Sequence, residues 1–260
     1  MLLNLLAVGD VSGDGGLDFL CRRLRGLKKE HDVHFTVVNG ENAAVVGALP
    51  RHVEDMYAAG ADVVTLGNHT WNKMQIADRL ETDPYLLRPA NFPGKLPGRG
   101  FGIYDGPRGL RIGVMSLMGR LHLNSNLDSP FTVADRLLSD CEADVVVCDF
   151  HAEITSEKGA MAWYLDGRVQ ALWGTHTHVP TADTQILPKG AGFVTDLGMT
   201  GPARSVLGVR PEDSINLFLG GIPRRFEPAT GPCQLNACLF TIDTETKKCV
   251  AVRRVDLREN

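Results

Sequence analysis

The first half of the sequence alternates between short apolar runs and longer amphipathic stretches, and this alternation is the strongest constraint on the fold. Runs such as LLNLLAV have the length of a buried strand, whereas the stretches between them repeat apolar residues at helical spacing. The pattern predicts strands at 2–8, 33–38 and 62–66 and helices at 16–30, 50–60 and 72–80. Strands that alternate with helices in this order favour a parallel sheet with right-handed crossovers.

The rest of the chain is less regular, and short strands dominate it from residue 169 onward. The segment 89–102 is rich in Pro and Gly and predicts a long surface loop, and 122–130 is a polar loop able to lie over a site. The remaining predicted elements are helices at 132–140 and 158–167 and strands at 111–117, 144–150, 169–174, 235–243 and 249–257. The turn DTETKK between the last two strands indicates a hairpin.

These elements together predict an α/β fold in which two mixed β-sheets pack face to face with helices outside, a four-layer α/β/β/α sandwich. A chain of 260 residues is long enough to bury a large core. The sequence contains no repeats, low-complexity tracts or clear linkers, so we expect one domain over residues 1–260.

The composition excludes several classes of protein. The formal net charge is −4 and no block of Lys or Arg occurs, so we expect no binding of long nucleic acids. The apolar runs are far shorter than the roughly 20 residues of a membrane span, and the N-terminus lacks the basic region of a signal peptide. We therefore expect a cytoplasmic protein without a membrane partner. Six cysteines without a CxxC pair predict neither a disulfide framework nor a zinc ribbon.

Side chains that bind metal ions follow five of the predicted strands. They are Asp10, Glu41, Asn42, Asn68, His151, His176 and His178. In α/β sheets, ligands bind beyond the carboxyl ends of the strands because adjacent loops splay apart there. We therefore expect these side chains to converge. His176 and His178 are two residues apart, which places both imidazoles on one face if the segment is extended.

The number and type of these donors favour two metal ions. Carboxylates and neutral imidazoles are ligands of Fe, Mn and Zn. Seven donors are too many for one four-coordinate zinc ion, whereas a shared carboxylate can hold two ions roughly 3.5–4 Å apart.

Most of these donors also have an ordinary structural interpretation. Glu41 can cap the loop that follows it, Asn42 and Asn68 are of a type common in turns, and the two histidines of GTHTH can be polar loop residues. Asp10 is different, because a carboxylate directly after a buried strand is costly to desolvate unless it has a role.

The order of the blocks GD, GEN, GNH, H and GTHTH resembles the calcineurin-like metallophosphoesterase superfamily, whose blocks run GDxH, GDxxD, GNH(D/E), H and GHTH. Two departures point to one branch. Ser12 stands where most members have a histidine ligand, and Glu41 followed by Asn42 stands where they have a bridging aspartate. Together with GNHTW, these changes resemble the YmdB-like family of phosphodiesterases along nearly the whole chain.

The resemblance implies the sandwich fold of the metallophosphoesterases and a division of the ligands between two ions. Glu41 would contact both ions. The first ion would be completed by Asp10, Asn42 and His178, and the second by Asn68, His151 and His176. The ions would be divalent or trivalent transition metals, with iron expected and manganese or zinc as alternatives.

The resemblance also assigns His69, the histidine of GNH, the role of general acid rather than ligand. The near-neutral pKa of histidine suits proton donation to a leaving alkoxide. Thr70 replaces the Asp or Glu that usually follows, so the sequence names no orienting partner for His69. His122 lies in the polar loop 122–130 and is a candidate for contact with substrate.

The function implied is a metal-dependent phosphodiesterase that acts on small nucleotides, with 2′,3′-cyclic nucleotides expected from the resemblance. Two alternatives remain at this point. One is a phosphomonoesterase of broad specificity, because the same centre hydrolyses both ester types. The other is a regulatory protein that responds to nucleotides and keeps the metals for structure, which would leave His69 without a role. A homo-oligomer is the general expectation for the assembly.

Overall fold

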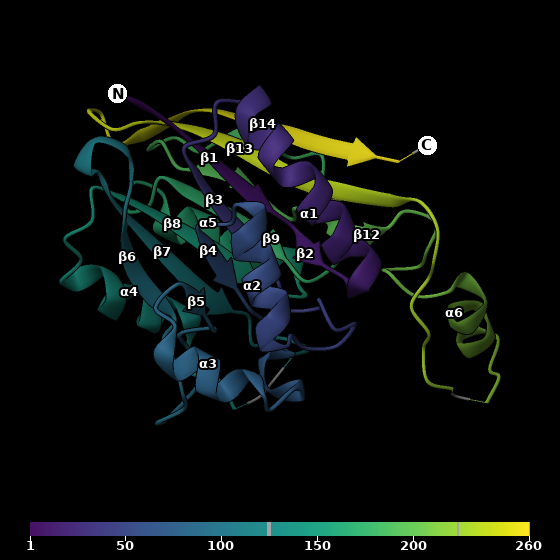
Figure 1. Ribbon diagram of the computed structural model, residues 1–260. Coiled ribbons are helices and arrows are strands. Elements are labelled where there is room, and N and C mark those ends of the chain that lie inside the picture. Colours follow the sequence, from purple (N-terminus) through teal and green to yellow (C-terminus); the bar gives the residue numbers. More distant parts are fainter. Residues whose placement is uncertain (124–125, 223, 260) are drawn as a thin grey trace.

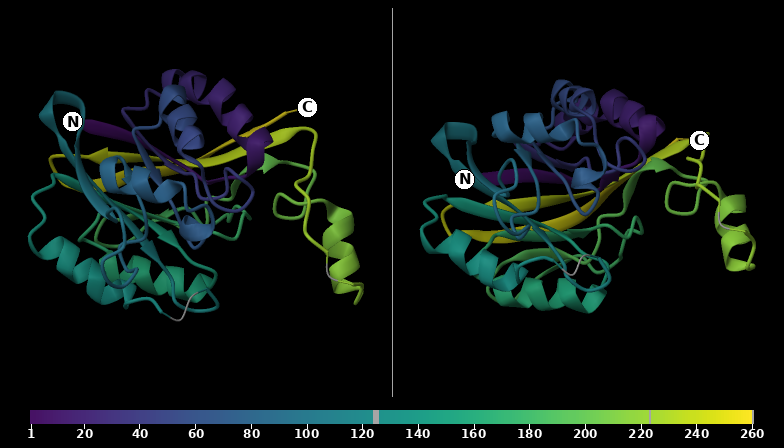
Figure 2. Two further views of the ribbon diagram at one scale, coloured as in Figure 1. Left: turned by 60° about the horizontal axis from the view of Figure 1, so that its bottom comes forward. Right: turned by 90° about the horizontal axis from the view of Figure 1, so that it is seen from below.

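The computed structural model describes residues 1–123, 126–222 and 224–259, and its β-strands form two sheets that pack face to face with helices on both outer sides (Figures 1 and 2). The order of layers is visible in the right-hand view of Figure 2. This arrangement confirms the predicted four-layer α/β/β/α sandwich.

The first sheet is mixed and contains the strands that come first in the chain. Its strands in spatial order are β2 (Asp10–Val11), β12 (Met199–Pro202), β13 (Cys233–Asp243), β1 (Leu2–Val8), β3 (Phe35–Asn39), β4 (Val63–Thr65) and β5 (Leu86–Leu87), and β14 (Lys248–Arg258) pairs with β13. β1, β3, β4 and β5 run parallel, as the alternating pattern predicted, whereas β13 runs antiparallel to β1. The predicted hairpin is the β13–β14 pair.

The second sheet carries the middle of the chain. Its strands in spatial order are β10 (Gln185–Ile186), β11 (Gly192–Val194), β9 (Ala171–Thr175), β8 (Val145–His151), β7 (Arg111–Met118) and β6 (Phe101–Asp105). The pairs β7–β8, β8–β9 and β9–β11 are parallel, so the carboxyl ends of β8 and β9 lie at the same edge.

The outer layers are helical. The helices α1 (Gly13–Glu30), α2 (Pro50–Ala59) and α3 (Ile76–Thr82) cover the first sheet, and α4 (Pro130–Ser139) and α5 (Thr155–Leu165) cover the second. Short 3₁₀ turns lie at Thr70–Asn72 and Pro107–Gly109. No helix in the described part of the chain combines the length and the apolar character needed to span a bilayer.

The strands are continuous apolar runs in the sequence because both of their faces are buried in the core. Leu6 of β1 packs toward the helices, whereas its neighbour Leu5 packs between the two sheets. Trp173 and Phe240 face each other in that central layer, with ring centroids 5.6 Å apart. A strand that is buried on both faces has apolar residues at successive positions, because successive side chains point to opposite faces.

Several predicted boundaries were wrong. Predicted loop 89–102 overlaps β6, which begins at Phe101. The predicted helix 72–80 is a 3₁₀ turn followed by α3, because Lys73 adopts an extended conformation and interrupts the helix. The predicted dominance of strands after residue 169 overlooked α6 (Pro211–Phe218). This helix begins with Pro211 and has acidic residues in its first turn, a combination that stabilises helix starts.

The helix α6 belongs to a segment that extends away from the two sheets (Figure 1). This segment, residues 203–232, connects β12 to β13 and is called the arm below.

Candidate metal centre

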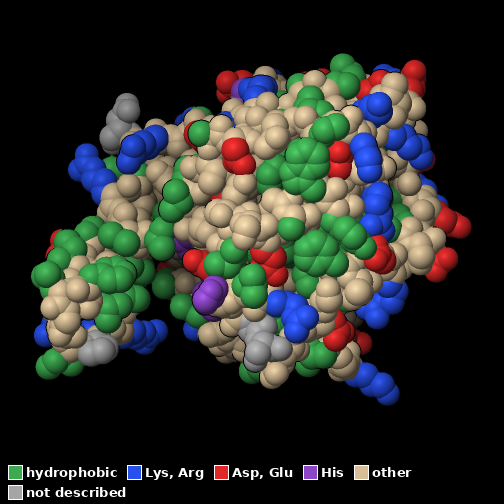
Figure 3. Space-filling model, turned by 180° about the vertical axis from the view of Figure 1, so that it is seen from behind, with side chains coloured by type: hydrophobic (Ala, Val, Ile, Leu, Met, Phe, Trp, Pro, Cys, Tyr) green, Lys and Arg blue, Asp and Glu red, His purple; other side chains and the backbone are tan. Residues whose placement is uncertain are grey.

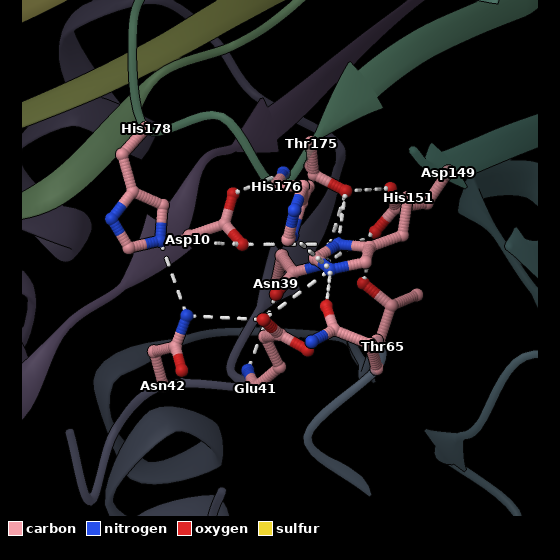
Figure 4. Close-up of polar contacts among 12 residues, drawn as sticks. Asp10, Asn39, Glu41, Asn42, Thr65, Asp149, His151, Thr175, His176 and His178 are labelled. Atoms are coloured by element: carbon pink, nitrogen blue, oxygen red, sulfur yellow. Dashed lines mark hydrogen bonds and ion pairs between the residues drawn. The ribbon is translucent and has the colours of Figure 1, made fainter. Parts of the chain in front are cut away.

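The predicted ligands converge where strands of both sheets end (Figure 4). His151, the last residue of β8, lies at the middle of one group of donors. Its Nε2 atom is 2.7 Å from Asn68 Oδ1, 3.3 Å from Glu41 Oε1 and 3.1 Å from His176 Nδ1. One donor atom from each of Glu41, His151 and His176 can be chosen so that all three lie within 4.8 Å of one another.

A second group of donors lies on the other side of Glu41. The Asn42 amide nitrogen donates to Glu41 Oε1 at 3.0 Å and lies 3.1 Å from His178 Nε2. His178 Nε2 is in turn 3.9 Å from Asp10 Oδ1. Asp10 and His178 therefore lie within the span of a two-metal centre, as the sequence required. Asp10 also lies close to the first group, because its Oδ2 accepts from the backbone nitrogen of His176 at 3.1 Å and its Oδ1 is 3.8 Å from His151 Nδ1. The division of the ligands between two ions therefore stays a prediction.

The carboxylates of the centre are fully buried, which is costly without positive charge beside them. Asp10 and Glu41 are both 0% exposed, and Asp10 Oδ1 has no hydrogen-bond partner among the described residues. Burial raises the pKa of Asp10 to about 6. Burial also acts to raise the pKa of Glu41, but the facing imidazoles of His151 and His69 outweigh it and hold that pKa well below its usual range.

The imidazoles of His151 and His176 differ from each other in their pKa values. Burial acts to lower the pKa of His151, yet the Glu41 carboxylate beside it raises that pKa to about 9. Burial lowers the pKa of His176 to about 3, so this ring is neutral and its nitrogen can bind a metal ion. The residues present fit transition-metal ions. Asp10 has a buried oxygen without a hydrogen-bond partner in the described part of the chain, and nitrogen and oxygen donors surround it.

Asp149 is a buried carboxylate that the sequence analysis did not identify, and it is connected to His151 through Thr175. Asp149 accepts hydrogen bonds from Thr65 Oγ1, from Asn39 Nδ2 at 3.0 Å and from Thr175 Oγ1 at 2.7 Å. Thr175 Oγ1 also lies 2.9 Å from His151 Nδ1. Because the hydroxyl proton is donated to Asp149, Thr175 accepts the proton of His151 Nδ1, which leaves Nε2 to face the donors.

The sequence holds a signal for Asp149. It is a charged residue inside the apolar run DVVVCDF and lies two residues before His151, hence on the same face of the strand. Asn39 and Thr65 stand at the ends of β3 and β4, so Asp149 links the two sheets beneath the centre.

The backbone conformation that brings the two histidines of GTHTH to the centre differs from the predicted one. The expectation of an extended segment was wrong, because β9 ends at Thr175 and His176 and His178 adopt left-handed conformations with φ of 99° and 63°. Such conformations cost on the order of 1–3 kcal/mol each for residues other than glycine. The loop therefore needs support from its surroundings.

A fully buried ion pair supplies this support. Lys158 of α5 donates to Asp196 Oδ2 at 2.6 Å, and both side chains are almost completely excluded from solvent. The same oxygen accepts from the backbone nitrogen of Thr177 at 3.2 Å and from its hydroxyl at 2.8 Å. Thr177 stands between the two histidines, so the ion pair fixes the loop at its midpoint.

The structure also provides the orienting partner of His69 that the sequence could not name. His69 Nδ1 lies 2.8 Å from Asn42 Oδ1 and 3.2 Å from Glu41 Oε1, and its backbone nitrogen donates to Glu41 Oε2 at 3.1 Å. The side chain is 30% exposed. The ring therefore has one nitrogen directed at the centre, and Nε2 remains for contact with a ligand.

His122 is exposed in the loop 121–123, and no hydrogen bond or ion pair within the described residues joins it to the seven predicted ligands. Part of the predicted polar loop 122–130, at residues 124–125, lies outside the described residues. Contact between His122 and substrate therefore stays a prediction.

Comparison with known proteins places this chain in a family. The chain matches the family described as YmdB-like protein over residues 6–255. A 2′,3′-cyclic-nucleotide 2′-phosphodiesterase of Bacillus subtilis (strain 168) is 42% identical over 261 residues, which cover 99% of this chain and 98% of that protein.

Two crystal structures are similar over nearly their whole length. A hypothetical protein from Thermus thermophilus is 38% identical with a TM-score of 0.92, over 99% of this chain and 100% of that chain. A protein described as a novel phosphatase from Mycoplasma pneumoniae is 34% identical with a TM-score of 0.94, over 100% of this chain and 95% of that chain.

Proposed function

Because the chain belongs to the YmdB-like family, we propose that it is a metal-dependent phosphodiesterase that hydrolyses small nucleotide phosphodiesters, 2′,3′-cyclic nucleotides among them. The observation that carries the proposal is the convergence of carboxylate, amide and imidazole donors around buried Glu41. The name of the Bacillus subtilis relative supports the substrate class, since the two chains are 42% identical over nearly their whole length.

The proposed centre would hold two ions, and Glu41 would serve both. Asp10, Asn42 and His178 would hold the first ion, and Asn68, His151 and His176 the second. Such ions neutralise phosphoryl oxygens and make water a nucleophile near neutral pH. Iron is the proposed metal, and manganese and zinc suit the same oxygen and nitrogen donors.

The proposed role of His69 is to give a proton to the leaving alkoxide. Asn42 and Glu41 hold the ring through Nδ1, which fixes its direction. Nε2 is then the nitrogen from which a proton passes to the departing oxygen, and the exposed part of the side chain allows a substrate to reach it.

The test compares turnover of a 2′,3′-cyclic nucleotide with turnover of p-nitrophenyl phosphate by protein of measured metal content. We expect higher kcat/KM for the cyclic diester and more than one transition-metal ion per chain. Faster hydrolysis of the monoester would favour a phosphomonoesterase. Nucleotide binding without turnover of either ester, in metal-loaded protein, would favour a regulatory protein with structural metals.

We also propose that the protein is a cytoplasmic homo-oligomer whose contacts include the arm. Phe218, Leu219 and Ile222 at the end of α6 are 85%, 82% and 80% exposed. Large apolar side chains that gather at an exposed position often mark a protein interface. Light scattering after size exclusion should give a mass above the 28.3 kDa of one chain, and Leu219→Asp should reduce it. A native mass of one chain would contradict the proposal.

A further inference from the structure

A cavity of about 510 Å³ lies between the arm and the loop that follows Asn42. Figure 3, which views the molecule from behind, shows the arm standing off the body with a hollow between them. The volume falls within the range of pockets that bind small molecules, about 300–1,000 Å³. A larger cavity of about 690 Å³ includes Asp144, which precedes β8, so it lies at the end of that strand opposite to His151.

Both walls of the smaller cavity continue into the candidate metal centre. On one side, Val45 lines the cavity and its backbone nitrogen donates to the carbonyl oxygen of Asn42 at 2.8 Å. On the other side, Val209 lines the cavity two residues after Leu207, whose carbonyl oxygen lies 2.9 Å from His178 Nδ1. The cavity therefore lies beside the centre, with walls that belong to the same two loops as Asn42 and the partner of His178.

The side chains of the cavity combine apolar surface with free hydrogen-bond donors. Val46 and Phe226 are 39% and 41% exposed, so their surfaces are available to a ligand. Lys73 and Arg225 also line the cavity, and neither side chain forms a hydrogen bond or an ion pair within residues 1–123, 126–222 and 224–259. An apolar wall with an aromatic ring suits the flat face of a nucleobase. Guanidinium and ammonium groups donate to the acceptor atoms on its edge.

We propose that this cavity binds the nucleoside part of the substrate, with the base against Phe226 and its acceptor edge toward Arg225 and Lys73. The proposal rests on the proposed function, because it places the phosphate of the same nucleotide at the metal centre. The arm then contributes to specificity as well as to assembly.

The test separates the base from the rest of the substrate. It compares kcat/KM for a 2′,3′-cyclic nucleotide with kcat/KM for methyl riboside 2,3-cyclic phosphate, which has the same ester and no base. Stacking of a base on an aromatic ring contributes about 1–3 kcal/mol, so Phe226→Leu should lower kcat/KM for the nucleotide by roughly tenfold. The same variant should leave the base-free ester unchanged.

Two matched variants serve as controls. Phe226→Tyr keeps the ring and should retain the preference for the nucleotide. Arg225→Ala should weaken that preference, whereas Arg224→Ala should leave it unchanged, because Arg224 precedes Arg225 in the arm but does not line the cavity. Equal loss on both substrates in Phe226→Leu would show that the ring only supports the arm, and no loss on either would show that the base binds elsewhere. Both results would overturn the proposal.

A binding measurement keeps this test independent of the proposed activity. Calorimetric titration compares the affinity of the metal-loaded protein for a nucleoside 3′-monophosphate and for ribose 3-phosphate. A preference for the nucleotide that disappears in Phe226→Leu would support the cavity even if neither ester is hydrolysed, and that absence of hydrolysis would refute the proposed function alone. Equal affinities in the native protein would overturn the cavity proposal.

Discussion

His69 is the most exposed histidine of the centre: its side chain is 30% exposed, against 19% for His176, 10% for His178 and 0% for His151. Nδ1 contacts Asn42 and Glu41, and the ring is partly exposed, whereas the ring of His151 is fully buried among the donors. His69→Ala should therefore leave the metals bound and slow the chemical step. The loss should be about 10²–10⁴-fold for a poor leaving group and smaller for p-nitrophenolate, which needs little protonation. Metal analysis and kcat on two esters measure this.

The comparison variant is His176→Ala. The ring of His176 lies 3.1 Å from His151 Nε2 and is one of the three donors that gather around Glu41, so this variant should lose metal and activity together for every leaving group. If His69→Ala behaved in the same way, His69 would support the centre and would not act as the acid.

Thr175 is the second residue whose role can be tested alone. Its hydroxyl connects Asp149 to His151 Nδ1 and so sets which nitrogen of His151 faces the donors. Thr175→Val keeps the shape of the side chain and removes this connection. Metal affinity should fall by about 10–100-fold, as for other residues that orient metal-binding histidines. Competition with a chelator of known affinity measures the change, and Thr175→Ser, which keeps the hydroxyl, should restore it.

The sequence was sufficient to propose the donors but not the residues that hold them. Each donor follows a strand, and local patterns locate the strands. The contact between Asn39 and Asp149 joins positions 110 residues apart and depends on how the two sheets pack. The hydrogen bond from His69 to Asn42 likewise depends on the geometry of two loops. Packing of this kind leaves no periodic signal in the chain.

At the scale of elements, the loop between β9 and β10 depends on the helix beside it. Lys158 of α5 and Asp196 after β11 form the ion pair that holds Thr177. Lys158→Met should lower the free energy of unfolding by about 3–5 kcal/mol, because it leaves a buried charge without a partner. Chemical denaturation measures the loss. The double variant Lys158→Met/Asp196→Asn should lose less than the sum of the two single variants, and additive losses would contradict coupling of the pair.

Element prediction succeeded where the pattern was local and failed where short segments depend on distant partners. Strand β1 and helix α2 were placed within a residue or so of their observed bounds. The neighbour of β1 on one side is β13, with Leu2 opposite Asp243, and nothing in either segment specifies this pairing. Two-residue strands such as β5 and β10 are defined only by such pairing. They are too short to show an alternating pattern in the sequence, so the sequence does not predict them.

At the scale of the whole molecule, the candidate centre joins the two sheets of the sandwich. Glu41 and Asn68 follow strands of the first sheet, whereas in the second sheet His151 ends β8 and His176 follows β9. The Asp10 carboxylate opposes this packing unless a cation faces it, because it is fully buried and burial raises its pKa to about 6. Metal binding should therefore stabilise the entire fold and not only the loops around the centre.

Thermal unfolding of chelator-treated protein measures this linkage. An ion that binds only the folded chain stabilises it by about 4.1 kcal/mol at 1,000 times its Kd. For a chain of this size 1 kcal/mol corresponds to roughly 2–4 °C in Tm, so added Mn²⁺ should raise Tm by on the order of ten degrees. His176→Ala should reduce the increase, whereas His122→Ala, which changes an exposed histidine outside the centre, should retain it. A Tm that does not respond to Mn²⁺, Fe²⁺ or Zn²⁺ would mean that the donors hold the sheets together by hydrogen bonds alone.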